Sequence, residues 1–245
     1  MELFFADPEQ ISGNQVILDE FESRHIMQTL RKKVGEIIHL TNGCGEHFIT
    51  QIIKDGKRLH LQIEKSEKIA PAAVNIILAV GFIKPNRLEF ILEKCTELGV
   101  NKFILFRSQF TNYISYNKER FVKIFRQAIK QSLQYYLPEI LILDSMDEFL
   151  QKTNNTNIRF CAVDANSPPV LDILNSSSIL QEDSVLMTIG PEGGFAPEEL
   201  DQFKINGFQS ISLGKNRLRT ETAAITSISI IQSFIQQQKE ADLGN

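Results

Sequence analysis

From residue 74 onward, short apolar runs alternate with segments of helical periodicity, and this alternation restricts the possible folds more than any other feature. Apolar runs of strand length occur at residues 74–83, 102–106, 140–143, 158–163, 185–189 and 209–213. Helical patterns follow at residues 85–98, 117–135, 146–152, 197–206 and 220–238. Strands that are apolar throughout and alternate with helices predict an α/β protein whose mostly parallel sheet is covered by helices on both faces.

The first 70 residues have a different pattern. Strand-like runs occur at residues 15–18, 36–40, 46–53 and 58–64, separated by turns rich in Gly, Asn and Asp. Evenly spaced strands and glycine turns predict a small β-barrel or meander. Residues 66–73, which contain Pro71, have the composition of a linker. We therefore expect two domains, residues 1–70 and residues 73–245.

Composition excludes several classes of protein. Hydrophobic residues make up 42% of the chain, which argues against intrinsic disorder and fibrous repeats. Cys44, Cys95 and Cys161 have no metal-binding spacing, so we expect reduced thiols and no metal. No run approaches the roughly 18 apolar residues of a membrane span. The start, with Glu2 and Asp7, lacks the layout of a signal peptide, so we expect a cytoplasmic protein.

Two loops that follow late strands combine glycine with charge. Residues 190–195 read Gly-Pro-Glu-Gly-Gly-Phe, and residues 214–222 read Gly-Lys-Asn-Arg-Leu-Arg-Thr-Glu-Thr before the last helix. In open parallel sheets, ligands bind beyond the carboxyl ends of the strands, and glycines allow a ligand to approach the backbone. A simpler interpretation stands beside this one: each loop is a turn, with Thr220 capping the last helix and Glu221 favoured by its dipole.

These loops lack the common nucleotide-binding patterns. The chain contains no GxxxxGK[ST] motif, which argues against a P-loop hydrolase, and no GxGxxG motif, which argues against a Rossmann dinucleotide site. All four histidines, His25, His39, His47 and His60, lie in the N-terminal part. Nucleophilic chemistry that uses a histidine base would therefore need both domains.

Basic residues gather in two places although the net charge is −4. Residues 24–33 contain no acidic residue, and residues 117–130 hold five basic residues against Glu119 alone. A charge run is usually a solvated helix face, but two such runs on an acidic chain favour contacts with a phosphate backbone. The residues singled out for this role are Arg24, His25, Arg31, Lys33 and Lys123.

Five segments, in order along nearly the whole chain, resemble one known family. They are Arg24-His25 with Leu30-Arg31 and Gly35, residues 42–45, residues 84–100 with Glu-Lys-Cys-Thr-Glu-Leu-Gly-Val, residues 190–194, and residues 213–223. The chain resembles the ribosomal RNA small-subunit methyltransferase E family, within the knotted SPOUT class of S-adenosylmethionine enzymes. It departs from the family pattern at Asn216, where an arginine is expected or is displaced to Arg217, and at residues 130–134.

The resemblance implies a fold, a cofactor and a partner. It implies a PUA-like RNA-binding barrel, a knotted α/β methyltransferase domain, and a homodimer whose interface includes the last helix, which is apolar on more than one side. It implies methyl transfer from S-adenosylmethionine to N3 of a uridine in small-subunit (16S) ribosomal RNA. The cofactor would lie among Ile189, Gly190, Gly193, Leu213, Gly214 and Leu218.

The chemistry of N3 methylation indicates which side chains the site needs. Uracil N3 carries a proton, so a base must remove it or a positive charge must stabilise the anion on O2 and O4. Arg219, just ahead of the last helix, suits stabilisation, and Arg217 can do the same or bind a phosphate. Glu221 can act as the base or position Arg219, and the ordinary acidity of a glutamate favours positioning.

Two other functions stay open from the sequence. A non-catalytic RNA-binding or ribosome-assembly module would keep the barrel and the basic residues without turnover. The intact loops at residues 190–194 and 218–222 argue against it, because a binding module has no need of a cofactor pocket. A SPOUT methyltransferase that acts on another RNA would show the same features.

Overall fold

The computed structural model describes residues 1–176, 179 and 183–243, and the chain divides into two compact units. The first unit contains Met1–Pro71 and Arg126–Leu137, and the second contains Ala72–Phe125 and Pro138–Asn245. Residues 126–137, which no sequence pattern associated with the N-terminal strands, therefore belong with them. Helix α3, Lys118–Ser132, contributes to both units.

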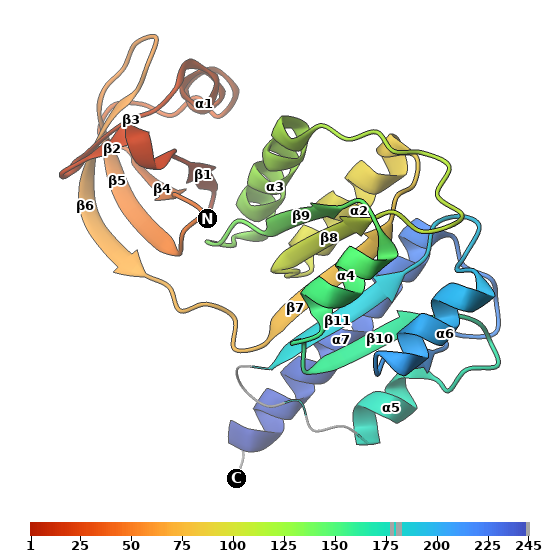
Figure 1. Ribbon diagram of the computed structural model, residues 1–245. Helices are drawn as coiled ribbons and strands as arrows, with labels where there is room; N and C mark the ends of the chain where they lie inside the picture. Colours follow the sequence, from red (N-terminus) through yellow and green to blue (C-terminus); the bar gives the residue numbers. More distant parts are fainter. Residues whose placement is uncertain (177–178, 180–182, 244–245) are drawn as a thin grey trace. The chain divides into compact units, whose positions relative to one another are not determined.

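The first unit is built on a six-stranded sheet of order β1-β4-β5-β6-β3-β2. Only β1 and β4 pair in parallel, and the sheet curves into half of a barrel (Figure 1). Its core contains the fully buried Val16, Leu40, Ile52 and Leu61. The strands are Leu3–Phe5 (β1), Ile11–Ser12 (β2), Gln15–Ile17 (β3), Ile37–Thr41 (β4), Glu46–Lys54 (β5) and His60–Lys68 (β6).

Short helical segments precede and connect these strands. They are η1 (Pro8–Gln10), α1 (Glu20–Arg24) and η2 (His25–Thr29). The side chain of Asp19 caps α1 by accepting a hydrogen bond from the Glu22 backbone N–H at 2.8 Å. Helix here was considered only as the solvated-face interpretation of the basic run at residues 24–33, because ten residues are too few to show a clear helical period.

The second unit confirms the parallel α/β prediction. Its six strands have the order β12-β10-β11-β7-β8-β9, and every neighbouring pair is parallel. The central strands are buried on both faces, as their continuous apolar character requires. The strands are Asn75–Gly81 (β7), Lys102–Phe106 (β8), Glu139–Leu143 (β9), Ile158–Ala162 (β10), Ser184–Ile189 (β11) and Gln209–Ile211 (β12).

Helices cover both faces of this sheet (Figure 1). Phe149 of α4 and Phe203 of α6 pack with Phe106 and Leu186 on one face. On the other face, α7 contacts α2, α5, β7 and β11. The helices besides α3 are Pro85–Glu97 (α2), Met146–Thr153 (α4), Val170–Ser176 (α5), Pro197–Ile205 (α6) and Thr220–Leu243 (α7).

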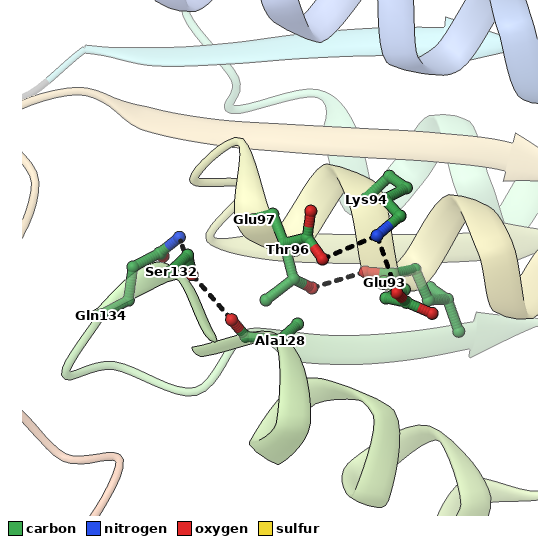
Figure 2. A network of polar contacts seen from close by, with 8 residues as sticks. Glu93, Lys94, Thr96, Glu97, Ala128, Ser132 and Gln134 are labelled. Carbon is green, nitrogen blue, oxygen red and sulfur yellow. Dashed lines mark hydrogen bonds and ion pairs between the residues drawn. The ribbon is translucent and has the colours of Figure 1, made fainter. Parts of the chain in front are cut away.

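Side-chain contacts fix the ends of α2 and α3. In α2, Lys94 Nζ lies 2.8 Å from Glu93 Oε1 and 2.9 Å from Glu97 Oε1, and Thr96 Oγ1 donates to the Leu92 carbonyl (Figure 2). In α3, Ser132 Oγ donates to the carbonyl of Ala128 at 2.7 Å (Figure 2). Helix α3 ends at Ser132, three residues earlier than predicted, and the next residue, Leu133, has a positive φ of 57°.

The strand order places three loops at one edge of the sheet. The chain runs outward from β7 through β8 to β9, crosses to β10, and then returns to fill the place between β10 and β7 with β11. The loops after β10, β11 and β12 therefore emerge at the carboxyl edge near the point where the strand order reverses. This is where open parallel sheets bind ligands.

Candidate functional site

A cavity of about 650 Å³ lies at the carboxyl ends of β10, β11 and β12. This volume lies within the usual range for a small-molecule site. Arg87, from the first turn of α2, joins its wall. The other lining residues are 162–165, 189–192, 194, 195, 200, 211, 213–220 and 223. The two loops selected from the sequence thus form a single site.

The loop after β11 is a tight turn. A Cβ on Gly190 would lie 3.2 Å from both the carbonyl carbon of Gly194 and Phe195 Cε2, so no larger residue fits without a shift. Gly194 has a φ of +77°, and its N–H donates to the Pro191 carbonyl at 2.9 Å. This turn brings main-chain groups to the cavity wall without intervening side chains.

The loop after β12 forms the facing wall. Ser212 Oγ bonds both the N–H and the carbonyl of Gly214, each at 3.2 Å, and Gly214 has a φ of +129° with open space where a Cβ would stand. The last helix starts at Thr220, and the Arg219 carbonyl accepts from the Ala223 N–H at 2.8 Å. Thr220 is therefore the first helical residue rather than the cap that the simple turn interpretation expected.

Most of the residues predicted to bind the cofactor line the cavity. Ile189, Gly190, Leu213, Gly214 and Leu218 all do so.

Gly193 lies outside the lining, and its neighbour Gly194 lines the cavity instead. A Cβ on Gly193 would stand 2.8 Å from the Cβ of Phe110, so the missing side chain makes room for Phe110. A part for Gly193 in cofactor binding stays a prediction.

The three residues predicted for catalysis occupy different positions. Arg217 and Arg219 are exposed and line the cavity. Glu221 does not line it, and its Oε1 lies 3.8 Å from Arg87 Nε. The expected contact between Glu221 and Arg219 is thus replaced by one between Glu221 and Arg87, because the side chain at the start of α7 faces α2.

Arg87 is a site residue that the sequence reasoning missed. Its Nη1 lies 3.7 Å from Glu192 Oε1, so one guanidinium faces carboxylates from the β11 exit turn and from α7. Glu192 Oε1 and Glu221 Oε2 are buried and have no hydrogen bond within the described structure. A cation in the first turn of a helix opposes the helix dipole, and this was the signal that Arg87 has a special role.

Asp164 also lines the cavity and was missed. It follows β10, and its Oδ1 accepts hydrogen bonds from the N–H groups of Asn166 at 2.9 Å and Ser167 at 3.2 Å. This side chain shapes the third strand-exit loop. Its position after a buried parallel strand was the available signal.

The predicted RNA-binding residues of the first unit are exposed. Arg24, His25, Arg31 and Lys33 lie on or just after the helical segment between β3 and β4. Arg31 has a positive φ of 58°. All four side chains are thus exposed to solvent, as contacts with a phosphate backbone require.

The basic run of α3 is largely used within the protein. Arg120 pairs with Glu89, Arg126 with Asp7, and Lys130 with Glu22. Lys123 is exposed and makes no ion pair in the part of the chain that the structure describes. Counting charges thus overestimated the cationic surface of this helix, because partners distant in sequence neutralise three of its basic residues.

The first unit also holds a pair of close histidines. His39 Nδ1 and His47 Nε2 lie 2.9 Å apart, and Glu67 Oε2 lies 3.8 Å from His47 Nδ1. Burial and the charge of His47 lower the pKa of His39.

The described residues include all three cysteines of the chain. All three cysteines are free, and burial raises the pKa of the Cys95 and Cys161 thiols. No group of three or more His, Cys, Asp or Glu residues there could hold a metal ion. No described helix has the length and apolar character needed to cross a bilayer.

Comparison with known proteins defines the class and then the family. An RNA methyltransferase domain model matches residues 70–232, so the chain belongs to the RNA methyltransferase domain family. It is 32% identical over 210 residues to the ribosomal RNA small subunit methyltransferase E of Rickettsia conorii, covering 85% of each chain. Identity to the Synechocystis protein of the same name is 28% over 94% of this chain and 76% of that one. The chain is therefore a member of the ribosomal RNA small subunit methyltransferase E family.

Two solved structures with bound cofactor are similar to this chain in fold. The Neisseria gonorrhoeae ribosomal RNA small subunit methyltransferase E bound to S-adenosyl methionine matches with a TM-score of 0.82 and 28% identity, over 95% of this chain and 97% of that chain. A Legionella pneumophila protein in complex with the bound cofactor SAM has the same TM-score and coverage, at 27% identity.

Proposed function

We propose that this protein transfers a methyl group from S-adenosylmethionine to N3 of a uridine in small-subunit (16S) ribosomal RNA. The observation that carries this proposal is the cavity at the β10, β11 and β12 exits, whose wall contains two exposed arginines, Arg217 and Arg219. Family membership and the cofactor bound in the N. gonorrhoeae relative support it.

The cavity residues fit the cofactor. Ile189, Leu213 and Leu218 offer apolar surface for an adenosine, and the turns at Gly190 and Gly214 offer main-chain donors and acceptors for its polar edges. When bound, S-adenosylmethionine supplies an electrophilic methyl group on a sulfonium.

Arg219 stabilises the negative charge that spreads over O2 and O4 as the uracil loses its N3 proton. Arg217 supports the same charge or holds a neighbouring phosphate. The proton leaves to solvent, and N3 then forms the bond to the methyl carbon while the carbon–sulfur bond breaks. Because Glu221 lies outside the cavity lining, it acts through Arg87 and positions the start of α7 rather than receiving this proton.

The remainder of the chain binds RNA in this proposal. Residues 1–70 form a PUA-like RNA-binding barrel, and Arg24, His25, Arg31 and Lys33 contact phosphates. Lys123 adds a contact from α3. Residues 73–245, apart from residues 126–137 that belong with the first unit, form the SPOUT methyltransferase domain, with the knotted threading of that class.

The same proposal includes a homodimer that forms through α7 and completes the site. Ile225 and Ile230 of α7 stay only partly buried within one chain, which leaves apolar surface for a second copy. The protein works in the cytoplasm, on the ribosomal subunits made there. A non-catalytic assembly module is not favoured, because it would not need the cavity.

The change Arg219→Ala tests the catalytic role. We expect turnover on purified small subunits to fall about 10²-fold or more, since a preorganised group that stabilises developing charge is lost. Calorimetry should show nearly unchanged affinity for S-adenosylmethionine.

Lys102→Ala is the control, because Lys102 begins β8 at the opposite edge of the sheet and pairs with Glu139. Unchanged turnover in Arg219→Ala, or equal losses in both variants, would rule out the proposed role.

A further inference from the structure

The segment between β8 and α3 exposes several aromatic side chains. In this aromatic loop, residues 107–117, the exposed fractions are 41% for Phe110, 39% for Tyr113 and 45% for Tyr116. Aromatic side chains bury a large area when they pack in a core, so three exposed rings within seven residues call for an explanation.

The base of the aromatic loop is fixed by a buried carboxylate. Glu199, near the start of α6, accepts hydrogen bonds from Ser108 Oγ at 3.1 Å and from the Gln109 N–H at 2.8 Å. Ser108 N–H in turn donates to Thr111 Oγ1 at 3.0 Å. The rings are therefore presented from an anchored backbone, which reduces the entropy that a ligand must overcome on binding.

The aromatic loop adjoins two segments that border the cavity. Phe110 packs against Gly193, whose neighbours Glu192 and Gly194 line the cavity. Lys84 Nζ lies 5.5 Å from the centre of the Tyr113 ring, and this lysine stands three residues before Arg87.

Tyr116 stacks on Phe82, with ring centres 5.8 Å apart and planes at 23°. Phe82 directly follows β7, the strand next to β11. One face of Tyr116 is therefore supported, while almost half of the side chain stays exposed.

Charge indicates what these rings bind. Residues 107–118 contain Arg107 and Lys118 and no acidic residue, and Lys84 adds a third cation beside Tyr113. Aromatic rings among cations suit unpaired nucleotides, because bases stack on the rings while phosphates meet the positive charges. A protein partner with an apolar surface would offer no negative charge to these three cations.

We propose that the aromatic loop is a stacking platform for the unpaired nucleotides that flank the target uridine. This inference rests on the proposed function. Tyr113 and Tyr116 stack with flanking bases, while Phe110, packed against the β11 exit turn, contacts the nucleotide nearest the cavity.

Fluorescence tests the platform directly, because the chain contains no tryptophan. Tyr113→Trp and Tyr116→Trp each introduce a single reporter, and Ile205→Trp gives a matched control on α6, where Ile205 is 75% exposed. We expect a single-stranded oligoribonucleotide to quench both loop reporters saturably and to leave the control unchanged.

Two fluorescence results would overturn the proposal. One is bound RNA, detected by anisotropy of a labelled oligonucleotide, without quenching at either loop reporter. The other is a signal that changes with protein concentration and not with RNA, which would assign the loop to contacts with a second copy of the chain.

Kinetics give an independent test. In the double variant Tyr113→Leu/Tyr116→Leu, we expect the KM for small subunits to rise at least about fivefold, as loss of base stacking implies, with unchanged affinity for S-adenosylmethionine. The matched Tyr113→Phe/Tyr116→Phe variant keeps the rings and should have a KM at least about fivefold below that of the leucine pair.

Equal KM values for the two double variants would contradict stacking. If the wild-type protein methylates no small-subunit RNA, the proposed function fails, and quenching by the oligoribonucleotide still decides whether the aromatic loop binds unpaired nucleotides.

Discussion

At the scale of single residues, Arg87 determines how the site is held together. Its guanidinium faces Glu192 and Glu221, and each of these carboxylates has a buried oxygen without a hydrogen bond in the described structure. Removal of the cation leaves two carboxylates of like charge near each other. The start of α2, the β11 exit turn and the start of α7 then lose their common contact.

We therefore expect Arg87→Gln to lower the free energy of unfolding by up to about 1 kcal/mol and to reduce turnover more than cofactor affinity. Arg87→Lys should recover part of both losses. Urea unfolding and steady-state kinetics measure these effects.

Lys94→Gln is the matched control, since Lys94 lies on the same helix and also faces two glutamates (Figure 2). Lys94 is not among the residues that line the cavity. The Lys94 ion pairs join residues within one helix, and pairs of this kind contribute only about 0.2–0.5 kcal/mol each to stability. If the Lys94 and Arg87 variants behave alike, Arg87 has no positioning role.

The histidine pair predicts a pH dependence of stability. The pKa of His39 is lowered by burial and by the charge of His47, so in the folded protein it lies below its ordinary value. Below about pH 7 the unfolded chain then binds more protons than the folded one, and stability falls as the pH drops through the folded pKa of His39.

Urea unfolding between pH 8 and pH 5 checks this, with His39→Gln as the comparison. At each pH, the free energy of unfolding of the variant is subtracted from that of the wild type. This difference removes the contributions of Glu67 and Tyr135, which face His47 from β6 and from residues 126–137. A variant whose stability falls with pH as steeply as that of the wild type would show that His39 does not carry the effect.

At the scale of elements, the start of α6 connects the cavity wall to the aromatic loop. Glu199 Oε2 accepts from the Ala196 N–H at 2.9 Å and from Ser108 Oγ, and Oε1 accepts from the Gln109 N–H. A glutamine side chain at position 199 would place its N–H donors opposite the donor groups that now bond the carboxylate.

Glu199→Gln should therefore cost about 2–3 kcal/mol of unfolding free energy, because buried hydrogen bonds to a charged acceptor are lost. The neighbouring Glu198 is exposed, so Glu198→Gln should change stability by less than about 0.5 kcal/mol. Denaturant titration measures the free energy of unfolding of both variants. A Glu199→Gln protein as stable as the control would refute the anchoring role.

The elements also show what the sequence could predict. The central strands and the long helices were predicted because periodicity over many residues reports burial on one or both faces. Strands β1 and β2 and helix α5 were missed, since each has seven residues or fewer and gains its structure from packing rather than from an internal pattern.

The candidate site, too, was predicted only in part from the sequence. Glycine turns after buried strands pointed to the loops at residues 190–195 and 214–222, which the structure brings together around one cavity. The contacts of Arg87, and the ion pairs that use Arg120, Arg126 and Lys130, join residues distant in sequence, so no local pattern could predict them.

At the scale of the whole molecule, the sequence combines a strand-rich unit that exposes basic residues with a parallel α/β unit that carries the cavity. We propose that methyl transfer depends on one arrangement, in which the three strand-exit loops hold the cofactor in this cavity and Arg219 at its wall faces the uracil.

The most direct measurement is to incubate the protein with isotopically labelled S-adenosylmethionine and small ribosomal subunits that lack the modification, and to map the label by mass spectrometry. We predict a single methyl group on N3 of one uridine in 16S ribosomal RNA, and its absence with Arg219→Ala. A protein that binds the cofactor but leaves this RNA unlabelled, or that places the label on another atom or another RNA, would contradict the account.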